Sequence, residues 1–263
     1  MGRTDFGSDV ALTDDWIVVG ANLEHLLASN GGAAYVYRRQ PDGEIEYAQK
    51  LVASDVLEGP RLGESVELVG DELFIGAPLS DRDVVKQGVV HVYQLQDGVW
   101  QHFQELAHRE ANGNDSFGKT LSAHGDRLII GTTRDGSPAG GSGAAYVFER
   151  GPNGRWEQVA SLFATEPVFE YARSVAIWDD TAAIGAPEAF AAGKPTGGVD
   201  VFDLPCEICR ADLDADGALT IFDFLTYLNV FQDGDALADF DGDGELTLFD
   251  FLAFQTAFDA GCD

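Results

Sequence analysis

The sequence is poor in several residue types, and each shortage excludes a class of partner. It has 16 lysines and arginines against 45 aspartates and glutamates, and the resulting formal charge of −29 would repel nucleic acid phosphates and anionic lipid surfaces. No apolar run approaches the ~18 residues that a membrane-spanning helix needs. We therefore expect no nucleic acid partner and no membrane insertion.

Methionine is also scarce, with one residue in 263, and the start of the chain has no apolar core of a signal peptide. The first repeat begins directly at Phe6, so we expect that an upstream part with an export signal is missing from this chain. The three cysteines, Cys206, Cys209 and Cys262, all flank the acidic C-terminal segment. This placement favours a disulfide in an oxidising compartment, outside the cell or on its surface. A zinc site would lack its fourth ligand, because no histidine follows Cys206.

Glycine is abundant, and it marks an internal repeat. A unit recurs four times and begins with Phe6-Gly7, Leu62-Gly63, Phe117-Gly118 and Tyr171-Ala172. Each unit continues with a β-branched second strand that ends in glycine, such as Leu73–Pro78, and with a third strand such as Val89–Tyr93. Three units add a turn and a fourth strand, such as Trp100–Phe103. Four short antiparallel strands per unit predict the blades of a β-propeller in a mainly β fold.

The Phe-Gly opening and the Gly-Ala-Pro end of the second strand resemble FG-GAP repeats, the blades of integrin-α-type propellers. The resemblance covers residues 1–204, which we interpret as the first domain. It implies protein or glycan binding by the loop face of the propeller. If four blades suffice for a ring, the binding loops are those such as 22–31, 79–87, 132–142 and 188–196. Because the blades lack the Asp-x-Asp-x-Asp-Gly insert of calcium-binding FG-GAP blades, we expect no metal in the propeller. Propellers of the family have seven blades, so four units are either a fragment, the reading that we favour, or an unusual four-bladed ring.

Residues 205–263 contain two acidic loops of twelve residues, which we interpret as a second domain that binds two Ca²⁺ ions. Calcium takes six to eight oxygen ligands, and such loops supply them from positions 1, 3, 5, 7, 9 and 12, with glycine at position 6. The predicted ligands in the first loop are Asp212, Asp214, Asp216, Ala218 through its backbone, Thr220 through a water, and Asp223. The corresponding residues of the second loop are Asp239, Asp241, Asp243, Glu245, Thr247 and Asp250.

A helix is predicted after each loop, and its apolar residues are expected in the core: Phe224, Leu225, Leu228 and Phe231, then Phe251, Leu252, Phe254 and Phe258. Two loop-helix units that close on aspartate resemble dockerins, in particular the GC-type dockerin-like domains of secreted bacterial proteins. The resemblance implies a cohesin-like protein or cell-surface anchor as partner, and a disulfide from Cys262 to Cys209, with Cys206 as the alternative. Ile221-Phe222 and Leu248-Phe249 depart from the small polar recognition residues of cohesin-binding dockerins, which favours a different partner or packing.

Nothing in the sequence indicates catalysis. The five histidines form no His-Glu-x-x-His motif, and His91 occupies the strand position held by Tyr35 and Tyr146, so we interpret it as a packing or edge residue and not as a base. Ser65 lacks the closing glycine of a nucleophile elbow. We therefore predict a secreted or cell-surface calcium-binding protein that binds and anchors and is not an enzyme. The alternative is a component of a polysaccharide-degrading enzyme, with its catalytic part in the propeller loops or in a missing N-terminal region.

Overall fold

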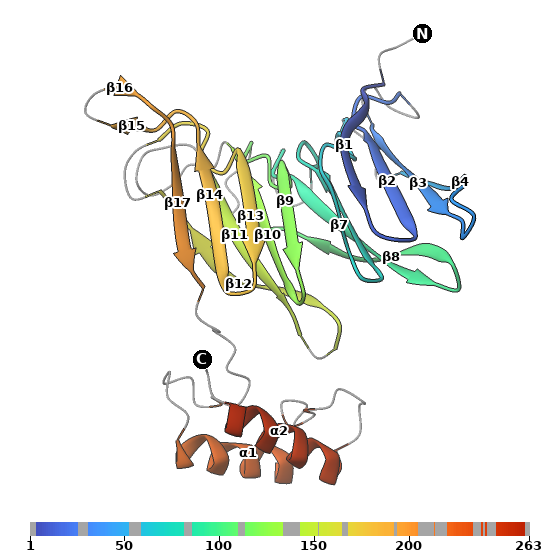
Figure 1. Ribbon diagram of the computed structural model, residues 1–263. Helices are drawn as coiled ribbons and strands as arrows, with labels where there is room; N and C mark the ends of the chain where they lie inside the picture. Colours follow the sequence, from blue (N-terminus) through green and yellow to red (C-terminus); the bar gives the residue numbers. More distant parts are fainter. Residues whose placement is uncertain are drawn as a thin grey trace. The chain divides into compact units, whose positions relative to one another are not determined.

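The computed structural model describes residues 4–25, 31–52, 59–81, 86–109, 114–133, 143–151, 153–164, 168–191, 194–204, 213, 220–233, 238, 240 and 246–260. The chain divides into two compact units, one of Met1–Glu149 with Trp156–Phe202 and one of Arg150–Arg155 with Asp203–Asp263. The first unit is built of antiparallel sheets and the second contains two helices (Figure 1). The predicted mainly β fold is confirmed.

Four sheets follow one another along the chain as the blades of a β-propeller. The first contains β1 (Phe6–Leu12), β2 (Trp16–Ala21), β3 (Ala33–Arg39) and β4 (Ile45–Leu51). The second contains β5 (Val66–Val69), β6 (Glu72–Ala77), β7 (Val89–Gln96) and β8 (Val99–Leu106). The third contains β9 (Thr120–His124), β10 (Arg127–Thr132), β11 (Ala144–Arg150) and β12 (Trp156–Leu162).

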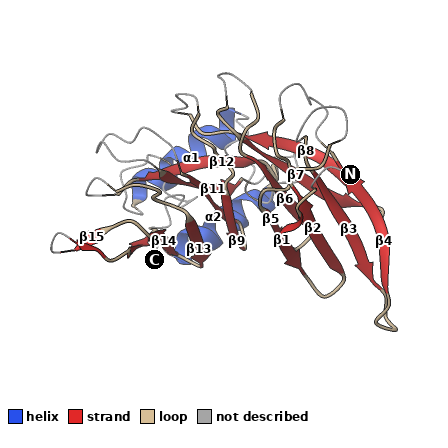
Figure 2. Cartoon of the chain, turned by 90° about the horizontal axis from the view of Figure 1, so that it is seen from above, coloured by secondary structure: helices blue, strands red, loops and turns tan. Residues whose placement is uncertain are grey.

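The fourth sheet has three strands among the described residues, as the sequence predicts. They are β13 (Ser174–Trp178), β14 (Thr181–Ala186) and β17 (Gly198–Asp203). A separate hairpin of β15 (Phe190–Ala191) and β16 (Lys194–Pro195) lies between the last two, and it was not predicted. The first strands pack in order, β1 on β5, β5 on β9 and β9 on β13, and they gather in the middle when the propeller is seen from above (Figure 2).

A repeated hydroxyl contact joins each blade to the next. Ser8 Oγ donates to the carbonyl of Gly63 at 2.6 Å, Ser65 Oγ to the carbonyl of Gly118 at 2.8 Å, and Thr120 Oγ1 to the carbonyl of Ala172 at 3.0 Å. The acceptor in each case belongs to the opening Phe-Gly or equivalent pair of the following blade. The recurrence of this pair is therefore explained by packing between blades.

In the first three blades the glycine of the second strand is required by the same contact. A Cβ atom on Gly76 would lie 2.1 Å from the carbonyl oxygen of Gly118 and 2.3 Å from Ser65 Oγ. Gly20 faces Gly63 in the same way, at 2.1 Å. No side chain fits at these distances, so glycine is the residue that allows neighbouring blades to approach.

A tryptophan and a glutamine repeat the connection at the fourth strands. The Gln49 side chain accepts from the backbone NH of Trp100 at 3.0 Å and donates to its carbonyl at 2.9 Å. Gln104 makes the same two bonds to Trp156, at 3.0 and 2.8 Å. The first three blades are thus joined by hydrogen bonds at their first strands and at their fourth strands, with apolar cores between them.

The end blades carry both buried and exposed apolar side chains. Trp16 of the first blade is buried and packs edge-on against Trp100 of the second, with ring centroids 5.7 Å apart. Val10 on β1 and Trp178 on β13 are instead exposed over most of their surface. The extensive contacts between blades all join blades that are consecutive in the described part of the chain.

The helical unit contains α1 (Ile221–Asp233) and α2 (Leu248–Ala260). Its core is centred on Tyr227 and Phe254, whose rings stack nearly parallel at 4.1 Å, with Phe240 edge-on to both. The predicted core positions Phe224, Phe231, Phe251, Phe254 and Phe258 pack within or against this cluster. The prediction was wrong for Leu225, Leu228 and Leu252, which are exposed, and it missed Tyr227.

Candidate functional site

Four of the twelve predicted calcium ligands lie among the described residues, namely Thr220, Asp223, Thr247 and Asp250. The other eight, Asp212, Asp214, Asp216, Ala218, Asp239, Asp241, Asp243 and Glu245, lie outside them, as do the three cysteines. The described four stand at the last turn of each predicted loop, where it enters its helix. They show how positions 9 and 12 of each loop are held.

The first loop ends in a reciprocal helix cap. Asp223 Oδ2 accepts a hydrogen bond from the backbone NH of Thr220 at 2.8 Å, and Thr220 Oγ1 accepts one from the NH of Phe222 at 3.1 Å. Thr220 is thus the N-cap of α1 and Asp223 occupies its third position, as in a capping box. The pair fixes the direction in which the chain enters the helix.

The second loop ends in the same arrangement. Asp250 Oδ2 accepts from the NH of Thr247 at 2.6 Å, and Thr247 Oγ1 accepts from the NH of Phe249 at 3.1 Å. Both closing aspartates have no exposed surface. Burial of a carboxylate is costly unless it is hydrogen-bonded or bound to a cation, and here a helix N-terminus supplies part of the compensation.

The donor set of both loops suits a hard divalent cation. Every side chain at the predicted ligand positions is a carboxylate or a hydroxyl, apart from the two positions that contribute backbone oxygens. Oxygen ligands of this kind are those that Ca²⁺ prefers. The buried and fixed carboxylates of Asp223 and Asp250 fit the twelfth position of such loops, which closes the coordination shell.

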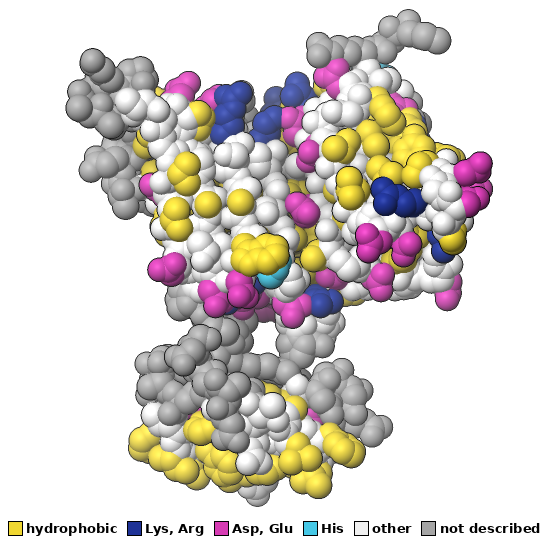
Figure 3. Space-filling view, viewed as in Figure 1, with side chains coloured by type: hydrophobic (Ala, Val, Ile, Leu, Met, Phe, Trp, Pro, Cys, Tyr) yellow, Lys and Arg dark blue, Asp and Glu magenta, His cyan; other side chains and the backbone are white. Residues whose placement is uncertain are grey.

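The helical unit exposes a set of large apolar side chains, and six of the seven come in pairs from equivalent positions of the two helices. Between 42% and 68% of each is exposed, and the set comprises Ile221, Phe222, Leu225, Leu228, Leu248, Phe249 and Leu252. Figure 3 shows hydrophobic side chains along one face of these helices. We call these seven residues the apolar helix face. Contiguous exposed apolar surface of this kind is typical of protein interaction sites.

The propeller carries a pocket of about 220 Å³ between loops of the second and third blades. Its polar lining is dominated by three cations, Arg61, Lys86 and Lys119, and it is completed by Pro78, Leu79, Asn114, Ser116 and Thr133. Lysine and arginine side chains gather along this edge of the propeller (Figure 3). In a chain of net charge −29 such a concentration of cations favours a ligand that carries an anionic group.

Contacts with neighbouring blades fix one wall of this pocket. Lys119 forms an ion pair with Glu64, whose other carboxylate oxygen accepts a hydrogen bond from Asn22. Next to the lining residues Asn114 and Ser116, Asp115 Oδ2 lies 3.2 Å from His108 Nε2, and both side chains are buried. Because Asn114 and Ser116 flank Asp115, this buried pair holds the loop that lines the pocket.

Two of the pocket's loops were predicted from the sequence and the rest were not. Pro78, Leu79, Lys86 and Thr133 lie in or beside the predicted binding loops 79–87 and 132–142. Arg61, Asn114, Ser116 and Lys119 belong to the segments that lead into the first strands, which sequence analysis missed. Arg61 and Ser116 have positive φ angles of 57° and 62°, and the residues at the same place in the other two blades, Asp5 and Glu170, have 48° and 53°. The sequence marks these positions in one way: each residue directly precedes the opening Phe-Gly or equivalent pair of its blade.

The family model for the FG-GAP repeat matches residues 2–37, 46–93 and 100–148, which together make up half of the chain. The protein belongs to the FG-GAP repeat family. The fold is one suited to protein or ligand binding, and FG-GAP repeats are typical of extracellular or cell-surface proteins. No curated protein matches the sequence. Neither described helix has the length and apolar character needed to cross a membrane.

Proposed function

We propose that this protein is an extracellular or cell-surface binding protein with two functional parts. The propeller binds a protein or glycan partner through its loops, at a pocket that accepts a carboxylate or another anionic group. The C-terminal unit binds two Ca²⁺ ions and anchors the protein to a protein partner. The proposal assigns no catalytic role to either part.

The observation that carries the proposal is the identical capping of the two helices. Thr220 with Asp223, and Thr247 with Asp250, form the same reciprocal bonds with the same complete burial of the aspartate. A solvated Asp-Gly turn does not require its closing carboxylate to be buried, whereas a calcium loop requires that carboxylate to point inward. The repetition supports two equivalent calcium sites.

Calcium also explains how so many carboxylates are kept together. Each predicted loop places four aspartate side chains within twelve residues, and they repel one another when no cation is bound. Binding of Ca²⁺ removes this repulsion, so the ions contribute directly to the stability of the two loop-helix units. The small aromatic core around Tyr227 and Phe254 completes the unit.

The apolar helix face is the proposed docking surface. Phe222 and Phe249 occupy equivalent positions at the start of the two helices, and both are more than half exposed. The loops position these residues through the helix caps, so docking depends on calcium. An apolar face of this kind fits a partner with a hydrophobic protein surface and not a polar glycan.

Calorimetric titration of the full chain with Ca²⁺ tests the proposal. We expect two sites per chain, and we expect Asp223→Asn and Asp250→Asn each to remove one of them. Asparagine keeps an oxygen that can accept the capping hydrogen bond, so the helix start is preserved while the charged ligand is lost. Asp97→Asn, in a propeller turn, is the matched control and leaves both sites intact. A stoichiometry of zero would contradict the proposal.

A further inference from the structure

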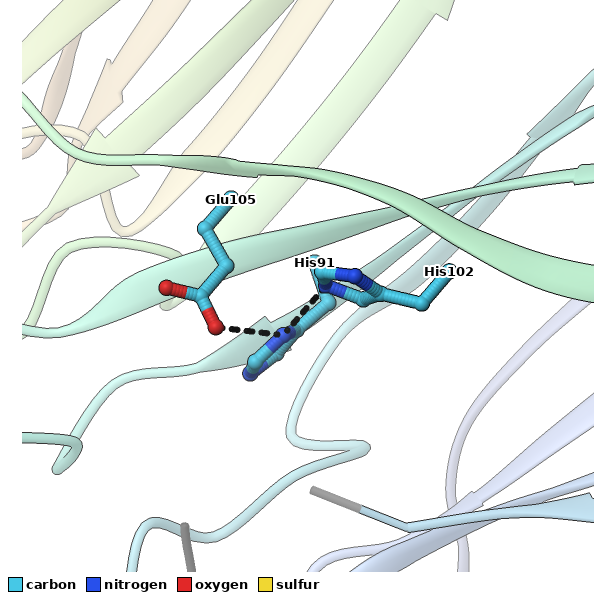
Figure 4. A group of neighbouring side chains, drawn as sticks. All are labelled: His91, His102 and Glu105. Carbon is cyan, nitrogen blue, oxygen red and sulfur yellow. Dashed lines mark hydrogen bonds and ion pairs between the residues drawn. The ribbon is translucent and has the colours of Figure 1, made fainter. Parts of the chain in front are cut away.

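The outer strands of the second blade bring two histidines and a glutamate together (Figure 4). His91 lies on β7, while His102 and Glu105 lie on β8. His91 Nδ1 is 3.3 Å from His102 Nε2 and 3.6 Å from Glu105 Oε1. The three ligand atoms all lie within 4.8 Å of one another, and no other trio of His, Cys, Asp or Glu side chains does so in the part of the chain that the structure describes.

A β-bulge creates this arrangement. His102 and Glu105 are three residues apart, so in a regular strand they would point to opposite faces of the sheet. The register between β7 and β8 shifts at Val92/Tyr93, so that His102 pairs with Tyr93 while Glu105 pairs with His91. Tyr93 and His91 share one face of β7, and the extra residue on β8 therefore brings His102 and Glu105 to that same face. The rings of Tyr93 and His102 confirm this, because they lie edge to face at 5.3 Å.

The first blade has the same bulge but a different chemistry. There the register shifts at Val36/Tyr37, and the corresponding pairs are Tyr37 with Tyr47 and Tyr35 with Lys50. Lys50 lies over the Tyr35 ring at 4.9 Å and is ion-paired with Glu24. A lysine cation and phenol groups cannot form a metal site of this kind, so the cluster of imidazole and carboxylate is a property of the second blade and not of the fold.

The third blade can be compared with the second at the same two positions. Counting from the repeated tryptophans Trp100 and Trp156, the positions of His102 and Glu105 correspond to Gln158 and Ser161. These two side chains also meet, since Gln158 Nε2 donates to Ser161 Oγ at 3.0 Å. The corresponding side chains thus meet in the third blade too, but only in the second blade are they metal-binding groups.

From this geometry we infer that His91, His102 and Glu105 bind a divalent transition metal ion of the zinc type. Zinc takes imidazole nitrogen and carboxylate oxygen in a tetrahedral arrangement, and Zn–N bonds of about 2.0 to 2.1 Å place neighbouring ligand atoms ~3.3 Å apart. The separations of 3.3 and 3.6 Å from His91 Nδ1 match that spacing closely. Two nitrogens and one oxygen favour Zn²⁺, or Cu²⁺ and Ni²⁺, over the Ca²⁺ that the C-terminal loops suit.

The surroundings of the cluster are compatible with an ion that exchanges with solvent. His91 is 2% exposed and is held between β6 and β8, whereas His102 is exposed and Glu105 is partly exposed. A buried ligand fixes the position of the ion, and the accessible ligands leave a path for it to enter. Three protein ligands leave one tetrahedral position for water or for a ligand atom from a partner.

The site differs from what we expected of the propeller. The missing Asp-x-Asp-x-Asp-Gly insert argues against calcium in the blades, and it says nothing about a transition metal held by imidazoles. The inference is independent of the calcium-dependent anchoring proposed above, because it involves a different unit of the chain and different ligand chemistry.

Titration of the full chain with Co²⁺, in excess Ca²⁺ and with alkylated thiols, tests the inference. Calcium occupies the acidic loops and alkylation blocks the cysteines, so cobalt reports on nitrogen and oxygen ligands alone. We expect the visible absorption of tetrahedral Co²⁺ at one site per chain, and we expect one equivalent of Zn²⁺ to displace it. His102→Gln and Glu105→Gln should each weaken binding by about tenfold or more, since loss of even an outer-shell partner costs 10- to 100-fold in affinity.

His25→Gln is the matched control, because His25 is an exposed histidine outside the cluster, and it should bind cobalt as the wild type does. Zn²⁺ should also raise the unfolding temperature of the wild type and of His25→Gln, but not that of His102→Gln. Equal cobalt affinity in the wild type and in both cluster variants would overturn the inference, as would the absence of a tetrahedral spectrum from the folded wild type.

Discussion

Ser65 Oγ donates a hydrogen bond of 2.8 Å to the carbonyl of Gly118, 53 residues away, and so joins the second blade to the third. Ser65 is 3% exposed, so this carbonyl is satisfied in a site that water hardly reaches. The same bond recurs from Ser8 and from Thr120, and it connects the repeat visible in the sequence with the packing of the blades.

Ser65→Ala should lower the free energy of unfolding by about 1 to 3 kcal/mol, because it leaves a buried carbonyl without its donor. Chemical denaturation of the variant and the wild type, both in Ca²⁺, measures the difference. A change within experimental error would show that the bond between the blades contributes nothing to stability.

Gly76→Ala should be more harmful than its single methyl group suggests. The new Cβ would lie 2.1 Å from the carbonyl oxygen of Gly118, so the second and third blades would have to move apart. We expect a loss of about 1 to 3 kcal/mol or more, as for overpacked cores. Gly151→Ala is the control, since its Cβ would meet no atom closer than 3.4 Å. Equal stability of the two variants would refute the close approach.

Glu67 should make the propeller less stable as the pH rises. Its carboxyl group has a pKa raised from 4.5 to about 7, mainly because of burial; a backbone hydrogen bond from Leu68 opposes the rise and the nearby charge of Asp9 adds to it. The folded state therefore binds the proton more tightly than the unfolded state, so the contribution is full below pH 4.5 and is lost as the pH rises through about 7.

Glu67→Gln removes this dependence. Its unfolding temperature relative to the wild type should therefore increase between pH 5 and pH 8, a range that brackets the raised pKa of about 7. Thermal unfolding of both proteins at the two pH values provides the measurement. A difference that is the same at both values would show that Glu67 does not titrate in this range.

The cysteine pairing is a prediction from the dockerin resemblance alone. A bond between Cys209 and Cys262 closes a loop of about fifty residues and restrains the unfolded chain by ~4 kcal/mol in the loop-entropy model. Peptide mapping, without reduction, of the protein isolated from its native compartment should recover these two cysteines in one linked pair. Recovery of Cys206 with Cys262 would establish the alternative pairing, and three free thiols would remove the argument for an oxidising compartment.

The repeat could be predicted from the sequence because packing between blades dictates its key residues. Gly20 and Gly76 lie against the next blade's backbone, so any other residue is excluded at these points and the pattern stays visible. Calcium binding by the two acidic loops stays a prediction, which rests on a similar argument, since the ion requires oxygen ligands at fixed positions. The pocket was not predicted in full, because the meeting of Lys119 with Glu64 depends on how separate blades pack.

In the two helices, the spacing of apolar residues did not predict correctly which side chains are buried. Helix α2 is apolar almost all the way round, so the spacing of its residues does not indicate which side faces the core. Leu252 was expected inside and is exposed, while Phe254 lies at the centre of the core. The cluster of His91, His102 and Glu105 was missed for a different reason: a bulge reverses the alternation of β8, and nothing in the local sequence marks its position.

Amide hydrogen exchange of the full chain with and without Ca²⁺ tests the central claim most directly, because it follows both units in one sample. With Ca²⁺ the amides of α1 and α2 should exchange slowly, and excess chelator should make them exchange at the rate of an unfolded chain. The amides of β6 and β10, in the propeller, serve as the internal control and should not change. Equal protection of α1 and α2 in calcium and in chelator would contradict the account of a calcium-dependent anchoring unit.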